Sequence, residues 1–128
     1  MASQYTLTVY LVGGDRTHIQ DLTIRLFDAQ WQEIRKSLVS SYTEKVRFRV
    51  SAGDVNLHVS FVRNGEAWQT PFWGFSVPQV TNVHLDMISG EPRTGSRTRE
   101  GAIAQQGAMR KEAPDHIRSS LPEASMLS

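Results

Sequence analysis

Histidine and aspartate side chains are the groups of this sequence best suited to acid–base or metal chemistry. His58 and His84 fall on outward positions of two predicted strands, and Asp86 shares a face with His84 because alternate residues of a strand point to the same side. A metal site there needs a third compact ligand, and the chain has no cysteine to supply one. His18, in the loop GGDRTH, is the other candidate for an active position. We interpret these residues as polar surface groups and expect no metal and no cofactor.

Motifs that mark common catalytic and nucleotide-binding sites are missing from the sequence. There is no G-x-S-x-G nucleophile elbow. The GGD at residues 13–15 is too short to cradle a phosphate, and no G-x-x-x-x-G-K-S/T follows it. Thiol catalysis and disulfide bonds are excluded because cysteine is absent. The sequence therefore predicts a protein without enzymatic activity.

A cluster of aromatic residues in GEAWQTPFWGFSVP is the strongest candidate for a binding surface. Trp68 and Phe72 share one face of an extended strand while Trp73 and Phe75 occupy the other, unless the intervening proline introduces a bulge. An exposed pair of Trp68 and Phe72 is suited to anchoring a protein partner or to stacking on a sugar. The alternative is that this face is covered, either by the segment around Trp31 or by the C-terminal residues.

Three arginines, Arg93, Arg97 and Arg99, are the remaining candidates for contact with a partner. They lie among small polar residues in EPRTGSRTRE, between Glu91 and Glu100, and no aromatic residue accompanies them. The chain has 14 lysines and arginines against 13 acidic residues, which gives a net charge of +1. Because proteins that bind nucleic acid generally present a basic surface with aromatic residues, we expect no nucleic-acid partner.

The elements that position these side chains are predicted to be strands. Residues 1–88 are rich in β-branched and aromatic residues that alternate with polar ones between frequent turn signals. Asn64-Gly65 favours a type I′ hairpin turn, and Gly53 stands where a tight turn needs a positive φ. Residues 31–42 fit a short edge strand or a helix, and we favour the strand because strands flank them. This pattern predicts one domain, a seven-stranded antiparallel β-sandwich with Greek-key connections, over residues 1–88.

Residues 89–128 differ from this body in composition. They contain four glycines and three prolines, but only four residues from leucine, isoleucine, valine and phenylalanine. Such a segment buries too little apolar surface to offset an ordering cost of roughly 1–2 kcal/mol per residue. We therefore predict an extended, mostly irregular C-terminal arm that is polar and disordered unless a partner holds it.

The order of strands and turns in residues 5–88 resembles that of transthyretin (prealbumin)-like and carboxypeptidase regulatory-like domains. The segments YTLTVYLV and DLTIRLFDAQWQEI are similar to their opening strand, loop and second strand, KVRFRVSAGDVNLHVSFVRNG to their central pair of strands, and VPQVTNVHLDM to their closing strand. Ala52 stands where the family usually has proline. The resemblance implies a β-sandwich with an accessory role, in stiffening, docking or binding, and it includes no catalytic motif.

We therefore expect a non-catalytic structural or interaction subunit of a larger assembly. In this hypothesis the sandwich docks on a protein partner, the arm threads over neighbouring subunits, and the partner-binding residues are Trp68, Phe72, Arg93, Arg97 and Arg99. The alternative is a small ligand-binding module, for example for carbohydrate, that uses exposed aromatics of residues 68–75. With neither a leader-like start nor a long apolar stretch, we expect no membrane insertion and a soluble protein in the cytoplasm or in a virion or other particle assembled there.

Overall fold

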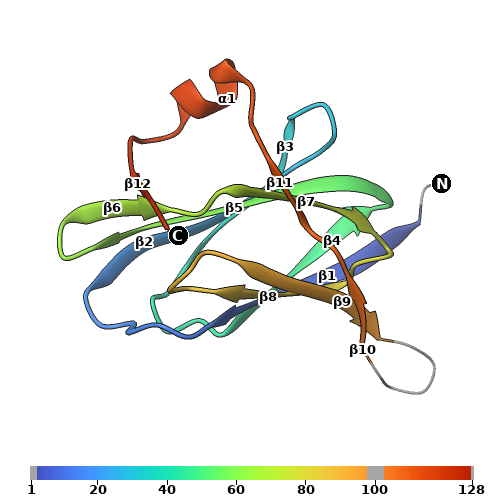
Figure 1. Cartoon of the computed structure of the whole chain (residues 1–128), viewed down its shortest axis with the longest axis horizontal. Coiled ribbons are helices and arrows are strands. Elements are labelled where there is room, and N and C mark those ends of the chain that lie inside the picture. Colours follow the sequence, from blue (N-terminus) through green and yellow to red (C-terminus); the bar gives the residue numbers. More distant parts are fainter. Residues whose placement is uncertain (1–2, 98–102, 128) are drawn as a thin grey trace.

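The structure, a computed structural model, describes residues 3–97 and 103–127. Two β-sheets pack face to face around an apolar core, which confirms the predicted all-β sandwich (Figure 1). None of the helical residues described forms a helix long and apolar enough to cross a membrane. The elements in chain order are β1 (Gln4–Val12), β2 (Ile19–Phe27), β3 (Glu33–Val39), β4 (Lys45–Ser51), β5 (Gly53–Arg63), β6 (Glu66–Gln69), β7 (Phe72–Val77), β8 (Asn82–Asp86), β9 (Pro92–Arg97), β10 (Ile103–Gln106), β11 (Met109–Lys111), α1 (Asp115–Ser120) and β12 (Ser125–Met126).

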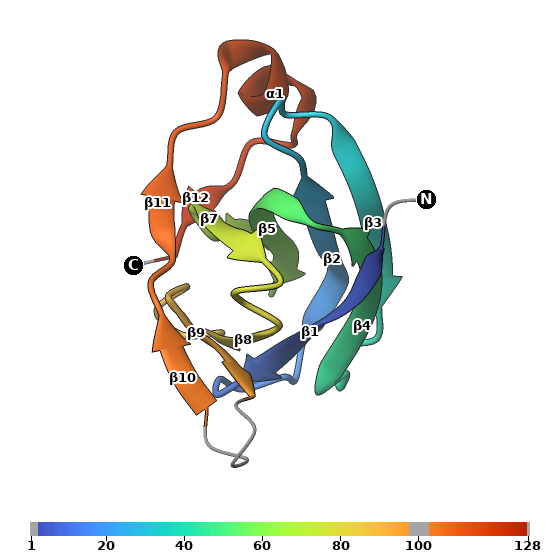
Figure 2. The same cartoon turned by 90° about the vertical axis from the view of Figure 1, so that its right-hand side faces the viewer.

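The two sheets contain more strands than expected. One has five strands in the order β10-β9-β8-β1-β4; the other has seven, in the order β11-β7-β5-β2-β3, with β6 on β5 and β12 on β6 (Figure 2). The pairs β1–β8 and β6–β12 are parallel, whereas the other pairs are antiparallel. The predicted number of seven strands is therefore approximate, because residues 1–88 form eight strands and later residues add β9 to β12. The parallel β1–β8 pair, which lies within residues 1–88, departs from a purely antiparallel arrangement.

Alternation along the strands builds the core and decides which side chains face outward. In β5, Val55, Leu57, Val59 and Phe61 are at most 2% exposed and point toward the facing sheet. Burial of each such side chain contributes roughly 1.5–3 kcal/mol relative to an exposed one. The intervening residue His58 is thereby directed to the outer face of its own sheet.

Several local predictions are confirmed. Asn64 and Gly65 have φ values of 51° and 78° and join β5 to β6 in a tight hairpin, and Gly53 has a φ of 141°. The ambiguous residues 31–42 contain β3, a strand that pairs antiparallel with β2. Turn residues and flanking strands were therefore sufficient to predict these elements.

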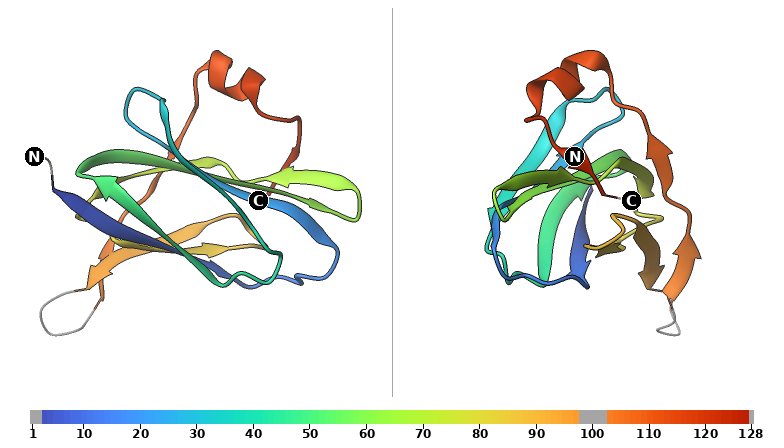
Figure 3. Two further views of the ribbon diagram at one scale, coloured as in Figure 1. Left: turned by 180° about the vertical axis from the view of Figure 1, so that it is seen from behind. Right: turned by 60° about the vertical axis from the view of Figure 1, so that its left-hand side comes forward.

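The C-terminal residues do not form the expected mostly irregular arm. β9 pairs with β8 and β10 with β9, and the chain then crosses to the other sheet, where β11 pairs with β7 and β12 with β6. We call residues 107–127 the strap; α1 lies within it, on the outer side of the seven-stranded sheet (Figure 3). Ile117 is 9% exposed and Leu127 6% exposed, so these two apolar residues are buried against the body, whereas Met109 and Met126 are exposed. Strand edges of the body supply the backbone partners that the sequence alone did not reveal.

Candidate functional site

A small apolar cluster lies between the strap and the outer face of the seven-stranded sheet. Phe72 is its centre, with ring centroids 5.8 Å from Phe27, 5.3 Å from Trp31 and 4.6 Å from His58. Ile117 of the strap packs onto this group, and Phe72 is only 7% exposed. The face is thus covered both by the Trp31 segment and by C-terminal residues, as in the alternative interpretation of the aromatic segment.

The expected exposed pair of Trp68 and Phe72 is therefore wrong. Trp68 is opposite Phe61 in the β5–β6 register and packs against the main core, whereas Phe72 is on the outer face. The break between β6 and β7 at Thr70 and Pro71 causes the difference, because it shifts the alternation by one residue. The bulge considered for the proline thus separates the two aromatic residues onto opposite faces.

His58 is a buried histidine on the outer face of the seven-stranded sheet. It is 1% exposed, its Nε2 is 3.0 Å from Oε1 of Gln69, and its ring stacks on Phe72. Burial lowers the pKa of His58 to about 4, the Gln69 hydrogen bond opposes this shift, and the charge of Arg25 adds to it. At neutral pH the ring is therefore uncharged, and its Nε2–H donates to Gln69.

Gln69 connects this buried ring to the end of the strap. The side-chain Nε2 of Gln69 donates to the backbone carbonyl oxygen of Ala124 at 3.0 Å, and the backbone carbonyl oxygen of Gln69 accepts from the Leu127 N–H at 2.8 Å. Nδ1 of His58 has no hydrogen-bond partner among the described residues. The polar groups beneath the strap thus serve to position β12 on β6.

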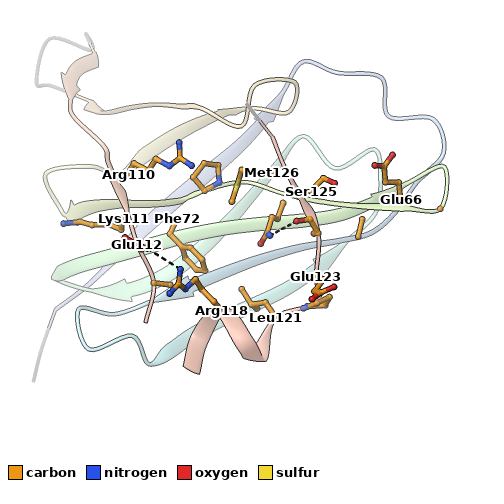
Figure 4. A pocket seen from close by; sticks show the side chains of 17 residues that line it. Glu66, Phe72, Arg110, Lys111, Glu112, Arg118, Leu121, Glu123, Ser125 and Met126 are labelled. Carbon is orange, nitrogen blue, oxygen red and sulfur yellow. Dashed lines mark hydrogen bonds and ion pairs between the residues drawn. The ribbon is translucent and has the colours of Figure 1, made fainter. Parts of the chain in front are cut away.

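A cavity of about 1140 Å³ remains between the strap and the sheet (Figure 4). Its sheet side includes Ala67, Pro71 and Phe72, and its strap side includes the end of α1 and the residues that follow. The charged side chains around it balance, with three acidic and three basic residues: Glu66, Glu112, Glu123, Arg110, Lys111 and Arg118. Arg118 is itself paired with Glu112, at 3.3 Å, and with Asp115.

The histidine pair considered for a metal is not brought together. His58 lies in the seven-stranded sheet, whereas His84 lies on β8 of the five-stranded sheet and stacks on Tyr10 with ring centroids 4.4 Å apart. Asp86 accepts hydrogen bonds from the backbone N–H groups of Ile88 and Ser89. Within residues 3–97 and 103–127 no three histidine or acidic side chains are grouped closely enough to hold a metal ion.

The loop that contains His18 is held by its own hydrogen bonds. Asp15 accepts from both the backbone N–H and the hydroxyl of Thr17, and these bonds lower the pKa of the Asp15 carboxyl. Arg16 donates to the carbonyl oxygens of Leu11, Ser41 and Thr43 at 2.8–3.1 Å. The charged residues around His18 therefore fix the loop against the sandwich.

The arginines named from the sequence do not join the aromatic residues. Arg93 is exposed on β9, in the sheet opposite to Phe72, and Arg97 ends the same strand. Arg99 lies outside the described residues. The predicted partner-binding set is thus divided between two sheets.

The cavity residues of the strap were missed because the segment was interpreted as disordered. A usable signal was present, since Ala113, Ile117 and Leu121 recur at intervals of four residues, the spacing of one helical face. These three residues contact the outer apolar cluster, although α1 itself spans only six residues.

Comparison with protein-family models, with curated proteins and with solved structures gives no match for this chain. The resemblance to transthyretin-like domains therefore stays a prediction, and function has to be argued from the geometry.

Proposed function

We propose that the protein is a non-catalytic interaction subunit that receives an extended segment of a partner protein in the cavity beneath the strap. The observation that carries this proposal is the way the strap is attached: its ends are hydrogen-bonded to the sheet, while its middle stands over a cavity of about 1140 Å³. The strap thus takes the role first expected for the whole C-terminal arm, as the element through which the subunit joins an assembly.

The chemistry of the cavity supports a peptide as its occupant. The balanced acidic and basic residues suit a segment of mixed sequence better than a polyanion, and Phe72 and Pro71 offer apolar contacts. β12 covers only Trp68 and Gln69 of β6, so Glu66 and Ala67 have no strand on that side within the described part of the chain. A partner segment can pair with this edge, as in β-strand addition.

Two further observations support an interaction role. The buried His58 contacts an amide and an aromatic ring, which suits positioning better than proton transfer at neutral pH. The absence of cysteine is compatible with a reducing compartment such as the cytoplasm.

The test is a pull-down from the native host with three forms of the full chain. Ala67→Trp fills the cavity from the sheet side, and Ala52→Trp adds the same side chain at the exposed turn between β4 and β5. We expect the unmodified chain and Ala52→Trp to retain the same defined proteins, and Ala67→Trp to retain at least tenfold less of them. Equal retention by both variants, with folding checked by circular dichroism, would contradict the proposal.

A small-ligand-binding module is the second candidate, favoured by the volume of the cavity, which is comparable with that of known ligand sites. An exposed aromatic platform for carbohydrate is not favoured, because Phe72 is buried and Trp68 packs against the core. A thermal-shift screen against a metabolite and glycan library distinguishes this candidate, since a true ligand raises the melting temperature of Ala52→Trp but not of Ala67→Trp.

A further inference from the structure

The outer face of the five-stranded sheet gathers basic side chains without acidic partners. Lys45, Arg47 and Arg49 alternate along β4 with core residues and are exposed, and Arg93 is exposed on β9. The ion pairs among the described residues involve Arg25 and Arg118, so these four cations have none there.

Strand register brings an aromatic stack between these cations. Tyr10 is paired with Lys45 on one side and with His84 on the other, and His84 is paired with Arg93. The rings of Tyr10 and His84 are parallel within 4°, with centroids 4.4 Å apart, and both residues are half-buried. One row across four strands therefore places the two aromatic rings between two cations, in the order Lys45, Tyr10, His84 and Arg93.

The fold separates charges that cancel in the sequence. The five strands of this sheet carry five basic residues and one acidic residue, which leaves nine basic and twelve acidic residues in the rest of the chain. The acidic residue, Asp86, is engaged by two backbone N–H groups at the end of β8. A net charge of +1 therefore conceals a positive face on one side of the sandwich.

We propose that this face binds single-stranded nucleic acid, although the overall charge of the sequence predicts no such partner. Lys45, Arg47 and Arg49 recur every second residue, at intervals of roughly 6.8 Å along the strand, and present a line of cations to successive phosphates. The Tyr10–His84 stack offers a ring surface on which an unpaired base packs, which a base inside a duplex cannot use. The site is on the sheet opposite to the cavity, so this inference goes beyond the proposed interaction function.

Fluorescence anisotropy with labelled 20-nucleotide oligothymidine and oligouridine tests the proposal on the full chain. We expect binding at 50 mM salt, with an affinity that falls on a log–log plot with a slope of about −2 to −3, as three or four phosphate contacts require. Arg47→Glu should weaken binding about tenfold and Tyr10→Ala at least fivefold. Lys36→Glu, which makes the same charge change on the exposed outer face of β3, should stay within twofold of the unmodified chain.

Three results would overturn the proposal. One is the absence of oligonucleotide binding at 50 mM salt while heparin or an acidic peptide binds, which would assign the face to another polyanion. Another is equal weakening by Lys36→Glu and Arg47→Glu, and the third is equal affinity for a duplex with no effect of Tyr10→Ala. Melting curves test whether each variant is folded. If Tyr10→Ala does not fold, Arg47→Glu, which is at an exposed position, still tests the proposal.

Discussion

At the scale of single residues, the neutral His58 ring is a fully buried polar group beneath the strap. It is enclosed by Phe72 on one side and held by Gln69, whose side chain also holds the strap backbone. A charged ring in this position has no acidic partner within the described hydrogen bonds and ion pairs, so protonation opposes the native packing. The residue therefore makes the stability of the molecule depend on pH.

Stability should fall as the pH decreases from about 6.5 to about 4. In this window the unfolded chain binds a proton at His58, whose ordinary pKa is 6.5, while the native ring, with its pKa lowered to about 4, does not. The loss amounts to about 3 kcal/mol across the window, at 1.36 kcal/mol per pH unit. Urea unfolding at pH 7 and pH 4.5 of the unmodified chain and of His58→Gln measures it.

The glutamine variant keeps an amide donor toward Gln69 but does not titrate, so it should lose much less stability than the unmodified chain. His116→Gln, at an exposed position of α1, is the matched control and should behave like the unmodified chain. If His58→Gln and the unmodified chain lose the same stability, the ring is not buried as described.

At the scale of elements, the strap is held by few contacts. β11 and β12 have three and two residues, compared with 11 in β5, and α1 has no side-chain cap at its N-terminus. Short elements over a cavity open at a lower free energy than the core strands. The strap is therefore suited to move aside for a partner segment while the sandwich remains folded.

Ile117→Ala should loosen the strap without unfolding the sandwich. The side chain is 9% exposed in the cluster around Phe72, and its truncation removes about 2 kcal/mol of local packing. Faster amide exchange at Arg118 and Leu127 with unchanged exchange in β2 and β5 is the expected result, measured by NMR. His116→Ala, at the exposed neighbouring position, should change amide exchange neither in the strap nor in β2 and β5. Uniformly faster exchange across the sandwich in Ile117→Ala would contradict a locally attached strap.

The strands that could be predicted are those with local signals. Alternation identified the core faces of β2, β4 and β5, and Asn64-Gly65 fixed the hairpin that follows. The strap carries only the weak signal of Ala113, Ile117 and Leu121 at intervals of four residues. The residues that they pack against, Phe27 and Phe72, lie far away in the sequence. Burial against a distant surface offsets an ordering cost that composition alone makes appear too high.

Pairing between distant strands was equally beyond local reasoning. The parallel pairing of β1 with β8 places His84 beside Tyr10 and far from the sheet of His58, and no local pattern specifies this neighbour. The one-residue shift at Thr70 and Pro71 likewise reversed the side on which Trp68 lies relative to Phe72. Both the basic face and the cavity are therefore products of topology.

At the scale of the whole molecule, the two outer faces of the sandwich differ in chemistry. One is covered by the strap and has balanced charge around a cavity, and the other carries Lys45, Arg47, Arg49 and Arg93 around an aromatic stack. The two sheets and the core between them separate these faces, so substitutions on one face should not affect binding at the other.

This independence is measurable with the variants already described. Ala67→Trp should leave the affinity for the oligonucleotide, measured by anisotropy, within twofold of that of the unmodified chain. Arg47→Glu should retain the same host proteins in the pull-down as the unmodified chain. A loss of both activities in either variant would indicate one continuous surface, with nucleic acid as the bridge to the captured proteins.

Hydrogen–deuterium exchange of the complex with the captured partner tests the central claim most directly. If a partner segment lies beneath the strap, exchange should slow in residues 66–69 and 107–127 when the partner is bound, and should stay unchanged in β4 and β9. Slower exchange confined to β4, β8 and β9, with the strap unaffected, would contradict the account and place the partner on the opposite sheet.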